Sequence, residues 1–212
     1  YTPSGLALGP DGTLWVSDRD NNRVLGFRPP FTTGMGASRL LVGGALTGFN
    51  QGGCPGVNNG SYLCAPAGLA VDHAGNLWVA DRDNNRVALF DTAPINGSPL
   101  VNPTPLAVLG QPSAVANAVN GGAMTPTAKT LRGPEGVSVE LRQVGDKLET
   151  VAVLVADTAN HRVLVYDPVA SGYGPAAKSV IGQLGAFDKA GYNTDQVLFE
   201  VPDNVVRGVY FP

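Results

Sequence analysis

The chain has 212 residues and a formal net charge of −3, from 14 basic and 17 acidic side chains. Hydrophobic residues make up 43% of it, which excludes a disordered chain, and no apolar run approaches the length of a membrane span. The basic residues form no cluster, so the sequence predicts no nucleic-acid partner. Charged residues reach 15%, against 28 glycines and 17 prolines, which favours many short strands joined by turns.

Two segments of the chain are closely similar. Residues 3–27 read PSGLALGPDGTLWVSDRDNNRVLGF, residues 66–90 read PAGLAVDHAGNLWVADRDNNRVALF, and they align without a gap. A third copy starts at Pro134 with PEGVSV, resumes as LVADTANHRVLVY and ends at Tyr166. Repetition on this scale indicates one structural unit stacked several times.

Each copy predicts four short antiparallel strands. The expected first strands are 6–8, 69–71 and 137–139, the second are 14–16, 77–79 and 153–155, the third is 86–90 in the second copy, and the fourth are 39–43, 106–110 and 179–182. The first hairpin of the third copy is stretched across Glu140 to Thr150, and we expect it to turn at Gly145 and Asp146.

Four short strands per unit is the composition of a propeller blade. We therefore expect an all-β fold in which residues 1–212 form a single partial β-propeller. Its three complete blades are expected at about 3–44, 66–111 and 134–183, and the start of a fourth at about 202–212.

The repeated motifs resemble the NHL repeat. Asn160, His161 and Arg162 carry the triplet that names the repeat, and the other copies have Asn-Asn-Arg at 21–23 and 84–86. The long segments between copies, which end in Leu-Gly-Gln or Ile-Gly-Gln, are similar to those of large bacterial NHL-repeat proteins. The resemblance implies a propeller that usually has six blades, so further blades or self-association are needed to close a ring.

Alternating strand direction sorts the connections of the blades onto two faces. The bend between the second and third strands lies at the same end as the long connections, at about 45–65, 112–133 and 184–201. Long loops are more often functional than short ones, so we expect binding on this face. The candidate binding residues are Arg19, Arg82, Asp20, Asp83, Asn59 and Tyr62.

Arg19 and Arg82 differ from the blade-building residues, because the third copy has Thr158 at their position. Two guanidinium groups on one face are suited to hold an acidic ligand or partner, and two solvated arginines are the alternative.

The series Asp18, Asp20, Asn22 and its copy at 81, 83 and 85 match the first half of a calcium loop. The match fails because arginine stands where the loop requires glycine. We therefore predict that these side chains fix the bend by accepting backbone and arginine hydrogen bonds, and we predict no metal ligands.

Cys54 and Cys64 lie ten residues apart in a segment rich in glycine and asparagine. We expect them to form a disulfide that closes a long loop, which implies an extracellular or periplasmic location. Two free thiols in a cytosolic protein are the alternative.

The sequence carries no hydrolase, metalloprotease or phosphate-loop motif, so it predicts no catalytic residue and no cofactor. We interpret it as a non-catalytic binding or scaffold module for a protein, a peptide or a glycan. The alternative is a fragment of a propeller enzyme, a metal-dependent lyase or a lactonase-like hydrolase, with calcium or zinc in its central channel. RNA binding, which the resemblance also implies for some animal proteins, is not favoured by the scattered basic residues.

Overall fold

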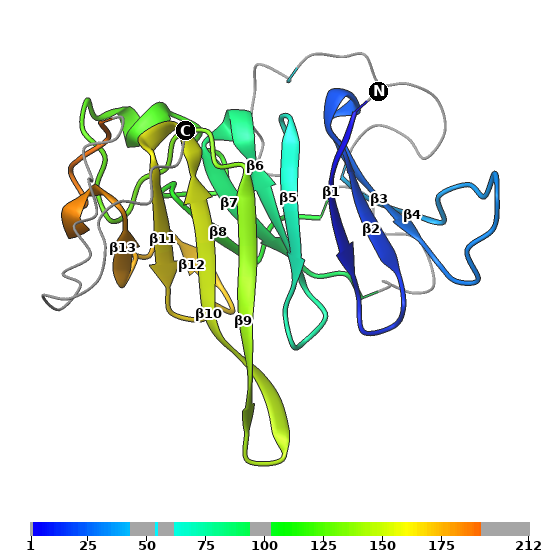
Figure 1. Ribbon diagram of the computed structural model, residues 1–212. Coiled ribbons are helices and arrows are strands. Elements are labelled where there is room, and N and C mark those ends of the chain that lie inside the picture. Colours follow the sequence, from blue (N-terminus) through cyan, green and yellow to red (C-terminus); the bar gives the residue numbers. More distant parts are fainter. Residues whose placement is uncertain (1, 43–53, 55–61, 94–102, 192–212) are drawn as a thin grey trace, which may run out of the picture.

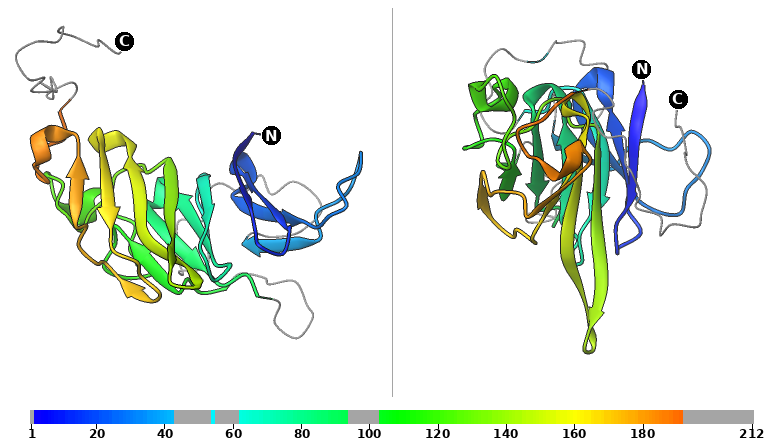
Figure 2. Two further views of the ribbon diagram at one scale, coloured as in Figure 1. Left: turned by 60° about the horizontal axis from the view of Figure 1, so that its bottom comes forward. Right: turned by 60° about the vertical axis from the view of Figure 1, so that its left-hand side comes forward.

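The structure is a computed structural model that describes residues 2–42, 54, 62–93 and 103–191. In these ranges the chain forms three sheets, each built on four antiparallel strands, and no α-helix; the second sheet gains a fifth, parallel strand. The sheets stand side by side as successive blades (Figures 1 and 2). The predicted all-β partial propeller with three complete blades is therefore confirmed, while the predicted start of a fourth blade lies outside the described residues.

Strands follow one another in sequence order across each blade. The first blade consists of β1 (Pro3–Leu8), β2 (Leu14–Asp18), β3 (Arg23–Phe27) and β4 (Arg39–Val42). The second consists of β5 (Pro66–Val71), β6 (Leu77–Asp81), β7 (Arg86–Phe90) and β8 (Ala107–Leu109). The third consists of β9 (Gly136–Val144), β10 (Lys147–Asp157), β11 (Arg162–Tyr166) and β13 (Ser179–Ile181).

The hydrophobic core lies between blades. Every residue of β6 and β7 is buried, because the second blade is covered on both faces. Trp15 of the first blade packs with Leu69 and Val79 of the second, and Trp78 of the second packs with Val153 and Val155 of the third. The near-continuous apolar runs of these strands follow from this two-sided burial.

The innermost strands of neighbouring blades approach each other closely. The amide of Gly68 in β5 donates a hydrogen bond of 2.8 Å to the carbonyl of Glu135, just before β9. A Cβ atom at Gly68 would lie 2.7 Å from that carbonyl oxygen, so the glycine of the repeated Pro-x-Gly motif is required by contact between blades.

Two features of the third blade depart from the repeat. Its first hairpin projects far beyond the other blades, and it turns at Gly145 and Asp146 as predicted (Figure 1). Its third-to-fourth connection contains β12 (Gly172–Tyr173), which pairs in parallel with β8 of the second blade. This two-residue strand, which the sequence does not predict, ties the outer edges of two blades together through the amide of Gly174 and the carbonyl of Val108.

The outward face of the first blade exposes two leucines on β1. Leu6 and Leu8 are 65% and 64% exposed, whereas Leu69, at the position of Leu6 in the second blade, is 8% exposed. The face of the first blade that carries Leu6 is therefore exposed, whereas the equivalent face of the second blade is buried against the first blade.

If this surface mediates self-association, replacing Leu6 and Leu8 together by serine is expected to reduce it, because the change removes the exposed apolar surface. The free energy of unfolding should change by less than about 1 kcal/mol, since neither side chain leaves a core. The matched change Leu69→Ser should cost about 2–5 kcal/mol. Sedimentation and denaturant unfolding measure both effects, and equal losses of stability in the two variants would contradict this assignment.

Candidate functional site

The bends between second and third strands are three short 3₁₀ turns. They are η1 (Arg19–Asn21), η2 (Arg82–Asn84) and η4 (Thr158–Asn160). Each ends on a residue in the left-handed region, Asn22, Asn85 or His161, with φ between 51° and 53°. Asparagine and histidine tolerate this region better than most side chains, which explains the residue types at this position.

Each bend is fixed by an aspartate, an asparagine and an arginine that repeat in all three blades. In the second blade, Oδ2 of Asp81 accepts hydrogen bonds from Nε of Arg86 at 2.6 Å and from Nδ2 of Asn84 at 2.9 Å. The corresponding sets are Asp18, Asn21 and Arg23 in the first blade and Asp157, Asn160 and Arg162 in the third. The prediction that the repeated aspartate and arginine build the bend is confirmed.

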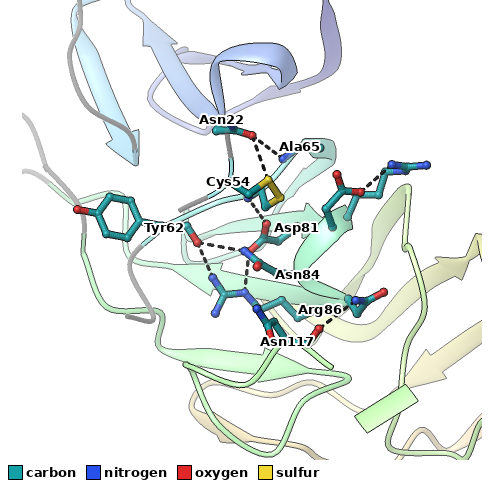
Figure 3. The surroundings of a disulfide bond; sticks show 12 residues. Asn22, Cys54, Tyr62, Ala65, Asp81, Asn84, Arg86 and Asn117 are labelled. Atoms are coloured by element: carbon teal, nitrogen blue, oxygen red, sulfur yellow. Dashed lines mark hydrogen bonds and ion pairs between the residues drawn. A yellow bond between two sulfur atoms is a disulfide. The ribbon is translucent and has the colours of Figure 1, made fainter. Parts of the chain in front are cut away.

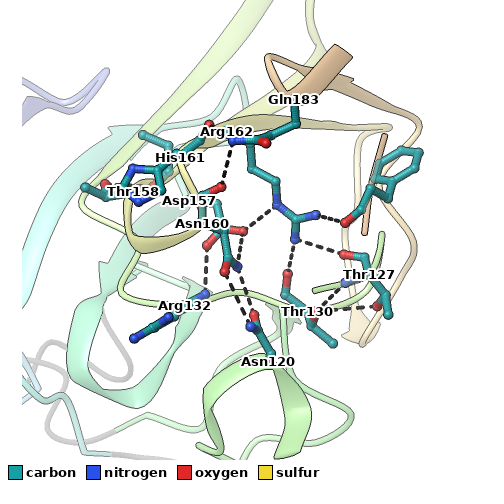
Figure 4. A network of polar contacts seen from close by, with 12 residues as sticks. Asn120, Thr127, Thr130, Arg132, Asp157, Thr158, Asn160, His161, Arg162 and Gln183 are labelled. Atoms are coloured by element: carbon teal, nitrogen blue, oxygen red, sulfur yellow. Dashed lines mark hydrogen bonds and ion pairs between the residues drawn. The ribbon is translucent and has the colours of Figure 1, made fainter. Parts of the chain in front are cut away.

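The arginine of each set also reaches the long connections. Arg86 donates to the carbonyl of Tyr62, at 2.8 Å, in the segment that enters its blade, and to the carbonyl of Ala114 in the segment that leaves it (Figure 3). Arg162 repeats this pattern, with the carbonyls of Thr127 and Thr130 on one side and that of Phe187 on the other (Figure 4). One guanidinium therefore holds two loops.

These ion pairs are buried. The side chains of Arg86 and Asp81 are 0% exposed, and so are those of Arg162 and Asp157. Burial raises the pKa of Asp81 above its ordinary value, against the opposing charge of Arg86. Burial also raises the pKa of Asp157, against the hydrogen bond that it accepts from the amide of Arg132. Such pairs depend on both partners, because one charge alone in this environment is strongly destabilising.

A buried glutamine completes the support of the connections that follow the second and third blades. Nε2 of Gln111 donates to the carbonyls of Asn85 and Ala118, at 3.0 and 2.8 Å. Gln183 makes the same kind of bridge from the carbonyl of His161 to that of Gly191. The recurrent Gly-Gln ending was visible in the sequence, but its role was missed because its partners belong to a bend and a loop elsewhere in the chain.

The left-handed asparagines link each blade to the next. Oδ1 of Asn22 accepts a hydrogen bond of 2.8 Å from the amide of Ala65, which precedes β5. Oδ1 of Asn85 accepts one of 2.9 Å from the amide of Gly133, close before β9. The series that resembles a calcium loop therefore divides into two structural positions and one exposed aspartate, Asp20 or Asp83.

Comparison with known proteins agrees with this repeated framework. The family model described as "NHL repeat" matches residues 1–27 and 63–90. Two of the three copies therefore match the NHL repeat.

Curated relatives match part of the chain. The E3 ubiquitin-protein ligase TRIM71 of Bos taurus is 35% identical over 111 residues, which cover 41% of this chain and 13% of the relative. The Mus musculus protein of the same name is 34% identical with the same coverage. The protein SUPPRESSOR OF QUENCHING 1, chloroplastic, of Arabidopsis thaliana is 29% identical over 42% of this chain and 8% of its own length. The chain thus spans a small part of each.

Solved structures with some likeness include a streptogramin B lyase and a luciferin-regenerating enzyme. The match to the lyase covers 90% of this chain and 42% of the lyase chain, with 14% identity and a TM-score of 0.41. The match to the luciferin-regenerating enzyme covers 82% of this chain and 48% of the enzyme chain, with 17% identity and a TM-score of 0.39.

The NHL framework leaves a few residues of the loop face free to differ between blades. The loop face is defined here as residues 18–22, 62–65, 81–85, 111–133, 157–161 and 183–191. Nε of Arg82 lies 2.9 Å from Oε1 of Glu135, and Nη2 of Arg19 lies 3.9 Å from the same oxygen. The two predicted arginines therefore converge on one carboxylate, from a residue that the sequence did not single out.

The other predicted binding residues are distributed differently. Asp83 pairs with Nη1 of Arg82 at 2.7 Å, and Asp20 is exposed. The backbone carbonyl of Tyr62 accepts a hydrogen bond from Arg86, so Tyr62 contributes to the structural framework. Asn59 lies outside the described residues.

Cys54 and Cys64 form a disulfide with a Cα–Cα distance of 5.1 Å, as predicted (Figure 3). The amide of Cys64 donates a hydrogen bond of 2.6 Å to Oδ1 of Asp81, so the disulfide anchors its loop beside a buried ion pair. Within the described residues, the group of side chains suited to hold a metal consists of these two cysteines and Asp83. Both sulfurs are bonded to each other, so this group offers no thiolate.

Reduction of the disulfide is expected to lower the free energy of unfolding by about 2–4 kcal/mol, because the closed loop restricts the unfolded chain. Denaturant unfolding with and without dithiothreitol measures the difference. The variant Cys54→Ser should show no response to the reductant. Mass spectrometry should show a gain of two hydrogens on reduction, and an unchanged mass would contradict the bond.

Proposed function

We propose that the chain is a non-catalytic binding module that holds a protein, a peptide or a glycan on the loop face outside the cytoplasm. A rigid framework that carries variable loops is a common basis for binding sites. Here two buried arginines and two buried glutamines hold the described loops by their backbone carbonyls. Other side chains of these loops, such as Val115 and Met124, are exposed to solvent, while Asn120 and Leu131 are buried.

The observation that carries the proposal is the exposure of apolar side chains on the connection of residues 111–133. Val115 is 54% exposed, Val119 is 47% exposed and Met124 is fully exposed. The same segment is anchored through Ala114 and Ala118 by Arg86 and Gln111. Exposed apolar residues on an anchored segment are typical of protein and peptide interaction sites, so these two partner classes fit best.

The disulfide supports the location, since such bonds persist in oxidising compartments. Among the described residues, no helix is long and apolar enough to cross a membrane.

The proposal is tested by selecting peptides from a displayed library on the immobilised chain and mapping the bound peptides by hydrogen exchange. We expect protection within residues 111–133. Changing Val115 or Val119 to aspartate should weaken the selected peptides at least tenfold, as expected for an apolar anchor. Leu148→Asp, a matched change of a half-exposed apolar residue on the projecting hairpin, should have no effect. Selected peptides that respond to Leu148→Asp alone would overturn the proposal.

A further inference from the structure

The position of Glu135 is special to the third blade. It occupies the middle of the Pro-x-Gly motif, where the first and second blades carry Ser4 and Ala67. Its backbone carbonyl joins the second blade to the third by accepting from Gly68. The side chain is not required for that bond, and it is 42% exposed.

The two arginines beside Glu135 are likewise outside the structural framework. Each follows the aspartate of its bend, and that aspartate is bound by a different arginine of the third strand. The side chain of Arg19 is 30% exposed and that of Arg82 is 37% exposed, so solvent reaches both. They come from the first and second blades, and they meet a carboxylate from the third.

Both guanidinium groups approach the same oxygen of Glu135. The contact of Arg82 is a hydrogen bond of 2.9 Å, while that of Arg19 is a longer ion pair of 3.9 Å. The fork of donors on a guanidinium is suited to a carboxylate with two oxygens. Nη1 of Arg82 is also paired with Asp83, at 2.7 Å. Because the two guanidinium groups share a single oxygen of Glu135, their remaining donors are only partly used.

We propose that Arg19 and Arg82 form a recognition site for a carboxylate of a bound peptide or protein, and that Glu135 is its internal competitor. This inference rests on the proposed function and names the chemistry of the partner. A ligand carboxylate displaces the Glu135 side chain and binds between the two guanidinium groups. Since Glu135 is tethered beside them, its high effective concentration weakens acidic ligands that lack further contacts.

The test uses a fluorescent tetraglutamate peptide and a tetraglutamine peptide of the same length, with binding measured by fluorescence anisotropy at low salt. We expect the tetraglutamate peptide to bind and the tetraglutamine peptide to bind at least fivefold more weakly. Glu135→Gln should tighten tetraglutamate binding about fivefold, and Arg82→Gln should weaken it about fivefold, the size of effect expected for a partly exposed charge pair.

Arg28→Gln is the matched control. Arg28 is exposed and lies beyond β3, at the end of the blade opposite the bends, so its removal changes the net charge equally. Equal weakening by Arg28→Gln and Arg82→Gln would show nonspecific attraction and overturn the site. Unchanged or weaker binding in Glu135→Gln would overturn the competitor role. If library peptides that bind the loop face ignore Arg82→Gln, this inference fails while the proposed function stands.

Discussion

Replacing Arg86 by methionine is expected to lower the free energy of unfolding by about 3–5 kcal/mol, because it leaves the carboxyl of Asp81 without its partner in a buried site. The same change removes donors from the carbonyls of Tyr62 and Ala114. Both loops next to the second blade should therefore loosen together with the bend. Urea unfolding gives the loss of stability, and hydrogen exchange shows where the loosening occurs.

Arg82→Met is the control for this prediction. Arg82 lies four residues earlier in the same bend, but its side chain is 37% exposed, and its ion pairs face solvent. Its replacement should cost no more than about 1 kcal/mol. Similar losses in the two variants would contradict the role given to the buried arginine.

The effect of Arg86→Met should depend on pH. Burial raises the pKa of Asp81, and loss of the opposing arginine charge raises it further. A carboxyl whose pKa is higher in the folded state than in the unfolded chain binds a proton on folding. Its penalty is therefore absent below the unfolded pKa of about 3.9, grows as the pH rises above that value, and is complete once the pH has passed the folded pKa. The double variant Asp81→Asn, Arg86→Met has no carboxyl there, so its stability relative to the natural chain should lack this trend.

The framework of the site could be predicted from the sequence because it repeats. Three copies of the same polar series, spaced by apolar runs, favour a structural role over a ligand role, and the ion pairs of Asp18, Asp81 and Asp157 agree. Strand order and the loop face followed from the alternating direction of four short strands in each copy.

Contacts between copies could not be predicted, because nothing in one repeat specifies its partners in another. The contact of Glu135 depends on the packing of three blades, because Arg19 comes from the first blade, Arg82 from the second and Glu135 from the third. The short strand β12 was missed for a similar reason. It has two residues, no apolar pattern and a partner in the neighbouring blade. The sequence predicted an acidic ligand from Arg19 and Arg82 alone, whereas the structure shows that a carboxylate of the chain itself, that of Glu135, already lies beside them.

Gly68→Ala is expected to be strongly destabilising, with a loss of about 3 kcal/mol in the free energy of unfolding. The added Cβ would lie 2.7 Å from the carbonyl oxygen of Glu135 and 3.0 Å from the Cα of Gly136. These are backbone atoms that have no side-chain rotamer to adjust. The second and third blades must therefore separate, which also stretches the hydrogen bond from the Gly68 amide.

Gly36→Ala is the matched control, because Gly36 has nothing within 4 Å of an added Cβ. It should leave stability unchanged or raise it by up to about 1 kcal/mol, through the restricted unfolded chain. Gly68→Ala should in addition move Glu135 away from Arg82, since the bond between blades and the ion pair involve the same residue. Tetraglutamate binding should then rise, as in Glu135→Gln, in conditions where Gly68→Ala remains folded. A stable Gly68→Ala variant with unchanged binding would show that the blades can separate without affecting the carboxylate site.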